Sequence, residues 1–234
     1  MLGFLVIGFV LGIRHSLDAD HLAAVGSLTA GGLGLRRAWV IGAAWGAGHT
    51  TSLLVAALAV VLIGLRIPER FSALAEAAVG VMLVILALRV FWRLGMGGRR
   101  HAHVHAHGPS EHLHSHSHPV PAGAEPHRAA TAHGHPHGVR SYAVGVVHGL
   151  AGSAAVMLLA VANAPSASVG VIYVLAFGIG SIGGMTLMST LLSMPLAISA
   201  GRWPGVNRFL QWTTGFVSLG LGVAIVLQAG VVRT

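Results

Sequence analysis

The sequence contains no cysteine and no lysine, and it carries few charges of either sign. Only 9% of its 234 residues are charged, whereas soluble domains are about 25% charged. The missing thiols exclude disulfides, thiol redox chemistry and the thiolate sites that favour Cu(I). Any metal site in this chain must therefore use nitrogen and oxygen ligands.

Apolar residues dominate, at 54% of the chain. They form stretches of roughly 20 residues, each long enough to cross a hydrocarbon layer of about 30 Å as a helix. The run 1–13 lacks the basic start and the cleavage site of a signal peptide, so we expect it to be retained. We predict an all-α membrane protein with six transmembrane helices, near residues 4–30, 38–65, 71–94, 141–163, 168–198 and 208–231.

One segment, residues 95–140, differs in composition from the rest and holds twelve of the sixteen histidines. Its His-x-His alternation is interrupted by Pro, Gly, Ser and Ala, so it cannot bury enough apolar surface to fold. We predict a disordered, metal-attracting loop over 95–140 between two three-helix repeats, 1–94 and 141–234.

The arginines predict the orientation in the membrane. The net charge of +8 comes from fourteen arginines, which lie mainly at the ends of apolar segments. They therefore indicate topology and not a nucleic-acid partner. The first, third and fifth connections between the predicted spans lie on one face of the membrane, and that face holds nine arginines. The opposite face holds three. The excess places the His-rich loop in the cytoplasm and both termini outside the inner (cytoplasmic) membrane.

An internal repeat supports the division into two halves. Gly12-x-x-His15 aligns with Gly145-x-x-His148, and Trp45-Gly46-x-Gly48-His49 then aligns with Phe177-Gly178-x-Gly180-Ser181. The spacing is 34 residues from His15 to His49 and 33 from His148 to Ser181. Three crossings per copy give the copies opposite orientation, so we predict a 3+3 inverted repeat with substrate bound between the halves.

Arg14-His15-Ser-Leu-Asp18-Ala-Asp20-His21 lies inside the first predicted span. Each charged residue at the centre of a membrane helix costs about 2.5 to 3.5 kcal/mol unless it has a partner, an ion or water. Imidazole and carboxylate together suit Ni(II), Co(II), Zn(II) or Cu(II). The alternative is a structural ion pair of Arg14 with Asp18, which leaves both histidines unexplained.

On a regular helix His15, Asp18 and His21 share an arc of roughly 120°, and Asp20 points elsewhere. Either the helix is unwound here, or Asp20 supports a neighbouring side chain, a ligating histidine or Arg14. His49, among small residues in the second span, is a candidate ligand or a hydrogen-bonded core residue. His148 has no acidic neighbour in the sequence, and a ligand role and a structural role are equally open.

These motifs resemble the nickel/cobalt transporter (NiCoT) superfamily, whose signature His-x4-Asp-His matches His15 through Asp20-His21. Gly48-His49-Thr50-Thr51 is similar to the second histidine motif of that family, which implies a site role for His49. The later Asp-Thr-rich motif of eight-span members has no counterpart here. The second half, with His148-Gly-Leu-Ala-Gly-Ser, is more similar to the shorter, six-span, UreH-like branch.

We therefore predict a nickel or cobalt transporter acting in uptake, without catalytic residues or a resident cofactor, with Ni²⁺ or Co²⁺ as the transported ion. The alternatives are efflux, a zinc-dependent intramembrane enzyme, for which no His-Glu-x-x-His is present, and a non-transporting accessory protein. Candidate partners are nickel metallochaperones and urease or hydrogenase assembly proteins. The predicted metal-site residues are His15, Asp18, Asp20, His21, His49 and His148.

Overall fold

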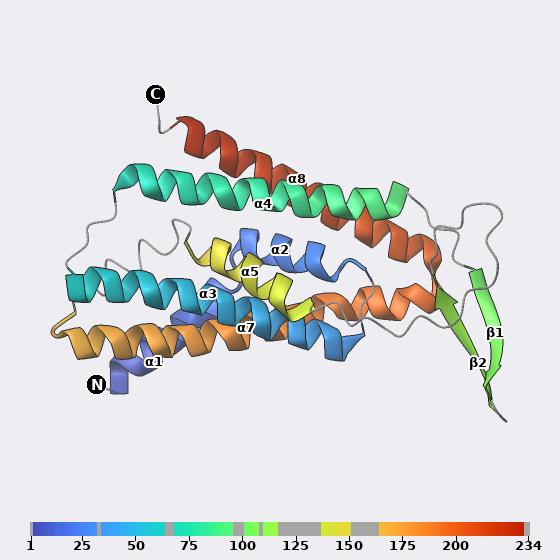
Figure 1. Ribbon diagram of the computed structural model, residues 1–234, viewed down its shortest axis with the longest axis horizontal. Helices are drawn as coiled ribbons and strands as arrows, with labels where there is room; N and C mark the ends of the chain where they lie inside the picture. The colour runs from blue at the N-terminus through green and yellow to red at the C-terminus, as the bar shows by residue number, and fades with distance from the viewer. Residues whose placement is uncertain are drawn as a thin grey trace.

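A computed structural model describes residues 2–31, 34–63, 68–95, 101–107, 110–116, 137–150 and 164–231. Within these ranges the chain forms seven helices and one two-stranded hairpin (Figure 1). The helices are α1 (Leu2–His15), α2 (Ala19–Thr29), α3 (Leu35–Ile63), α4 (Glu69–Gly95), α5 (His137–Gly149), α7 (Ala167–Arg202) and α8 (Pro204–Val231). The strands are β1 (His101–His107) and β2 (Ser110–His116).

Four helices, α3, α4, α7 and α8, are each long and apolar enough to cross a membrane. α1 and α2 pass the same test together as a span bent by 57°, which makes up to five spans. These five agree with five of the six predicted spans. Of the remaining predicted span, 141–163, the structure describes only residues 141–150, most of which belong to α5. The six-span 3+3 arrangement therefore stays a prediction.

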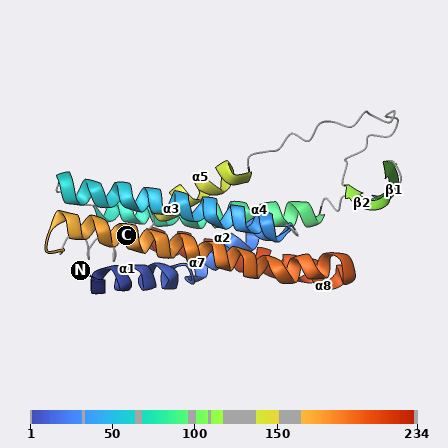
Figure 2. The ribbon, with the colours of Figure 1, turned by 90° about the horizontal axis from the view of Figure 1, so that it is seen from below.

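The long helices lie along one common direction (Figures 1 and 2). α1 begins and α8 ends at one end of the bundle, and β1 and β2 lie at the other. α1 packs along α7, α5 along α3, α4 along α8, and α3 along α7. The sequence repeat equates α1 with α5 and α3 with α7. Exchanging the two halves therefore maps the α1–α7 contact onto the α5–α3 contact, as in any repeat whose two copies are related by a two-fold axis.

Glycines bring these helices close together at equivalent places. A Cβ atom on Gly12 or on Gly180 would overlap a backbone carbonyl of the facing helix where α1 crosses α7. A Cβ atom on Gly48 or on Gly145 would do the same where α3 crosses α5. Small residues allow such close backbone approach in membrane helices. Each crossing lies next to one of the predicted site histidines, so it fixes the position of that side chain.

A buried apolar cluster fills the space beside these crossings. Trp45 of α3, Leu83 of α4 and Met185 of α7 are fully buried in it, together with Ala23, Ala24 and Val25 of α2. Because α2 follows the bend directly, this cluster anchors the helix that begins with the predicted site residues. The bend is therefore held by packing on three other helices.

The His-rich segment differs in part from the prediction of a loop without regular structure. β1 and β2 pair antiparallel, from His101 opposite His116 to His107 opposite Ser110. Alternating His-x-His has the two-residue period of a strand, which accounts for regular pairing over these fourteen residues. The rest of 96–136 lies outside the described residues.

Candidate metal centre

The centre is built on the break between α1 and α2. α1 ends at His15 and α2 begins at Ala19, so the span is not a regular helix through the motif. Asp18 occupies the N-cap position of α2 with extended backbone, φ −61° and ψ 146°, yet its side chain makes no cap hydrogen bond. Instead Asp18 Oδ2 lies 2.9 Å from His15 Nδ1. The helix is therefore interrupted at the motif, which was one of the two sequence-based alternatives.

Three histidines from three helices meet at this break. His15 comes from the end of α1, His21 from the first turns of α2 and His49 from the middle of α3. One ligand atom from each lies within 4.8 Å of the others. The Nε2 atoms of His15 and His49 are 3.1 Å apart, and the His15 and His21 ring centroids are 4.4 Å apart. His21 and His49 are buried.

A second group consists of Asp20, His21 and His148, again with ligand atoms within 4.8 Å. Asp20 Oδ1 accepts a hydrogen bond from the His21 backbone N–H at 3.0 Å and lies 3.0 Å from His21 Nδ1. Its other oxygen, Oδ2, is 2.9 Å from His148 Nε2. His148 belongs to α5, so the second half of the chain contributes to the centre. The two groups share His21.

Asp18 differs from the other five predicted residues. It contacts His15 but belongs to neither group, and its side chain is 50% exposed. Among the described side chains, the ion pairs all join a histidine to an aspartate, and an Arg14–Asp18 pair is not one of them. The described residues therefore do not form the structural ion pair between Arg14 and Asp18 that was the alternative interpretation of the motif.

Several nitrogen atoms in the centre lack partners. Within the described part of the chain, His21 Nε2, His49 Nδ1 and His148 Nδ1 are buried without a hydrogen bond. Buried polar atoms in folded proteins nearly always have a partner, and each exception needs an explanation, such as a bound water or ion. The described residues therefore leave hydrogen-bonding capacity of these buried imidazoles unused, as expected of side chains that hold an ion.

Two aromatic side chains border the histidines, and sequence reasoning did not assign them to the site. The Trp45 ring lies 5.5 Å from that of His21 and 5.6 Å from that of His148. The Phe177 ring lies 5.4 Å from that of His15. The sequence did contain a signal that could have identified them, because Trp45 and Phe177 occupy equivalent positions in the repeat, each directly before a Gly-x-Gly. These large apolar rings beside the histidines lower the local dielectric constant.

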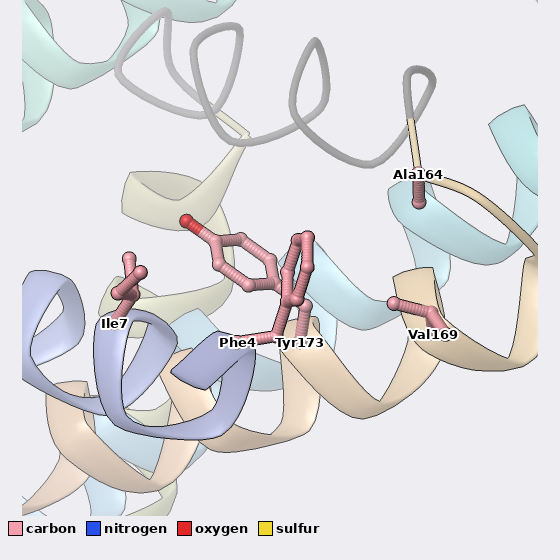
Figure 3. Close-up of a pocket in the computed structure, with 5 residues that line it drawn as sticks. All are labelled: Phe4, Ile7, Ala164, Val169 and Tyr173. Atoms are coloured by element: carbon pink, nitrogen blue, oxygen red, sulfur yellow. The ribbon is translucent and has the colours of Figure 1, made fainter. Parts of the chain in front are cut away.

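A pocket of about 220 Å³ lies elsewhere, between the first turns of α1 and of α7 (Figure 3). The Tyr173 hydroxyl is the single polar side-chain group among the residues that line it, Phe4, Ile7, Ala164, Val169 and Tyr173. None of these side chains is a usual ligand for a divalent ion. The histidine cluster, and not this pocket, is the candidate ion site.

The sequence profile of NicO, described as high-affinity nickel-transport protein, matches residues 1–233. The chain belongs to the NicO family. It is a nickel transporter and not an enzyme, and its apolar helices make it a membrane protein, as the sequence predicted. NicO membership favours nickel over the other ions that the donor set admits.

Other comparisons agree with this assignment. The chain is 34% identical to the urease accessory protein UreH of Bacillus sp. over 231 residues, covering 99% of the chain and 93% of that protein. It is 27% identical over 116 residues to a high-affinity nickel transport protein of Cupriavidus necator, covering 42% and 33% of the two chains. It is 26% identical to chloroplast protein FOR GROWTH AND FERTILITY 1 of Arabidopsis thaliana, covering 94% of the chain and 58% of that protein. No solved structure matches.

Proposed function

We propose that this NicO protein takes up nickel and binds Ni²⁺ inside the membrane through His15, His21 and His49. The observation that carries the proposal is the convergence of one ligand atom from each, on three helices, within 4.8 Å. Imidazole nitrogen is a ligand that suits nickel, and the absence of cysteine leaves no thiolate competitor in the chain.

Contacts with carboxylates select one nitrogen in two of the three rings, those of His15 and His21. Nδ1 of His15 faces Asp18 and Nδ1 of His21 faces Asp20, which leaves both Nε2 atoms for the ion. Ligating histidines commonly donate their other N–H to a carboxylate, which fixes the tautomer and orientation of the ring. Asp18 and Asp20 then act by orienting the ligands. Asp20 also lies in the second group and is a candidate ligand there.

The spacing of the nitrogens supports the same assignment. With metal–nitrogen bonds of about 2.1 Å, two ligands at 90° to each other around one ion are separated by about 3.0 Å. The 3.1 Å between His15 Nε2 and His49 Nε2 is close to this value. Two imidazoles at that distance are suited to sharing one ion of square-planar or octahedral geometry.

The second group, Asp20, His21 and His148, provides a second binding position for the ion. Because His21 belongs to both groups, an ion can exchange His15 and His49 for Asp20 and His148 without leaving His21. This exchange moves it toward the α5 side. We propose that rocking of the two three-helix repeats drives this exchange and alternates access to the site.

In this proposal the protein lies in the cytoplasmic membrane with the His-rich loop inside. The arginine distribution supports that orientation, and the end of the bundle that carries β1 and β2 is opposite to that where α1 begins. Histidines in the loop would collect ions released from the membrane site and pass them to cytoplasmic nickel-binding proteins.

Radioactive nickel uptake into vesicles containing only the purified protein tests the proposal. We expect accumulation by the wild type and none by His21→Ala, with equal amounts of folded protein in both samples. Comparison of cells with and without the gene tests direction, because uptake predicts less cellular nickel on deletion and efflux predicts more. Vesicles that bind nickel without accumulating it would instead support an accessory role, in line with the name of the Bacillus relative.

A further inference from the structure

The hairpin of β1 and β2, at one end of the helix bundle, places histidines of its two strands opposite one another (Figure 2). Its antiparallel register contains three positions at which a histidine of β1 is the partner of a histidine of β2. Neighbouring pairs are two residues apart along each strand, so all three lie on one face of the hairpin. The pairs are His101 with His116, His103 with His114, and His105 with His112.

The positions between these pairs hold other residues and lie on the opposite face of the hairpin. The partners there are Ala102 with Ser115, Val104 with Leu113, and Ala106 with Glu111. A shift of the register by one residue moves a whole strand to the other face. Such a shift would place a residue other than histidine opposite each of the six paired histidines. The pairing therefore depends on this register and not on the histidine content alone.

The spacing of a strand pair suits one divalent ion at each pair of histidines. In an antiparallel sheet the Cβ atoms of directly opposite residues are about 4.5 to 5.5 Å apart. Residues two apart along a strand are about 6.8 Å apart. Metal–nitrogen bonds are about 2.1 Å long, so two imidazoles at opposite positions can share one ion more readily than two imidazoles of successive pairs.

We propose that the hairpin binds three divalent ions in a row, one at each cross-strand pair of histidines. Each pair supplies two protein ligands, so its ion is held more weakly than at the membrane site, where three histidines converge. A single two-stranded hairpin is only marginally stable in water, and ions that join its strands also stabilise it. The inference goes beyond the proposed function, because it does not depend on the membrane site or on the direction of transport.

The number of nickel ions bound by the purified full-length protein tests the pairing. Equilibrium dialysis at nickel concentrations that fill the weaker sites compares wild type with two double variants, each of which lacks two histidines. His103→Ala with His114→Ala removes both members of one pair, so we expect a loss of about one ion. His103→Ala with His112→Ala breaks two pairs, so we expect a loss of about two ions.

Two further variants serve as controls. His103→Val combined with Val104→His keeps the composition but moves one histidine to the other face, and it should lose about one ion. His21→Ala should lose the ion of the membrane site and keep those of the hairpin. Thermal unfolding checks that the membrane helices are intact in every variant.

The outcomes separate this inference from the proposed function. If the two double variants lose the same number of ions, or neither loses any, the histidines bind without regard to the register and the inference is wrong. Full binding by the variant that exchanges residues 103 and 104 would also overturn it. If the hairpin ions are found and His21→Ala removes no ion, the proposed membrane site fails while the hairpin sites stand.

Discussion

Substitution of Asp20 by Asn tests whether the carboxylate orients the histidines. Asp20 lies 3.0 Å from His21 Nδ1 and 2.9 Å from His148 Nε2. Hydrogen bonds to a charged group contribute about 1.5 to 3 kcal/mol, and neutral ones about 0.5 to 1.5 kcal/mol. The amide therefore loses about 1 kcal/mol at each imidazole, or about 2 kcal/mol in total. Loss of a carboxylate that orients a ligating histidine weakens metal binding by about 10- to 100-fold, and we expect a Kd for nickel that is roughly 30-fold weaker.

Asp18→Asn is the matched control for Asp20→Asn. Asp18 contacts one imidazole, at 2.9 Å, and is 50% exposed, so solvent already screens its charge. We expect it to weaken nickel binding by about threefold, which corresponds to less than 1 kcal/mol.

Titration calorimetry of the purified protein in detergent measures both Kd values, and thermal unfolding without nickel checks that each variant is folded. A larger loss of affinity in Asp18→Asn than in Asp20→Asn would refute the assigned roles, because it would make Asp18 the more important carboxylate. Equal affinity of Asp20→Asn and wild type would refute the role of Asp20 altogether.

Four other substitutions and one deletion test separate parts of the structure. His21→Ala should abolish nickel binding at the membrane site in calorimetry because His21 belongs to both ligand groups, whereas His148→Ala should weaken it by about 10- to 100-fold. Gly180→Ala should abolish uptake and lower the thermal unfolding midpoint, because a Cβ atom there overlaps the backbone of α1 at an overpacking cost of about 1 to 3 kcal/mol. Gly183→Ala in the same helix meets nothing within 4 Å and should match wild type in both assays. Deletion of residues 101–137 should raise the nickel concentration needed for half-maximal uptake without lowering the maximal rate, since the loop lies outside the membrane site.

The apolar spans and the group of site candidates were predictable because membranes impose simple rules. A residue such as Asp20 in a long apolar run is costly enough to require a function, and lipid requires helices. The repeat also predicted which helices would be equivalent. Five of the predicted spans agree with described helices to within a few residues.

The separate roles of Asp18 and Asp20 were not predictable from helical periodicity. On a regular helix Asp18 shares a face with His15 and His21, and Asp20 does not. The break after His15 changes this, because Asp18 becomes the N-cap of α2 and Asp20 enters its first turn beside His21. No glycine or proline marks residues 16–18, so the bend depends on tertiary packing of α2 that a local pattern cannot contain.

The repeat is more symmetric in packing than in chemistry, and this difference indicates what each half does. Ser181 stands where the first half has His49, and its hydroxyl donates to the Gly12 carbonyl at 3.2 Å. That bond joins α7 to α1 at a glycine crossing, as the equivalent crossing joins α3 to α5. In the described residues, the second half therefore preserves the crossing but replaces the imidazole with a hydroxyl. His148 is its one histidine near the centre, so in the proposed function the first half supplies most of the ligands and the second half supplies one.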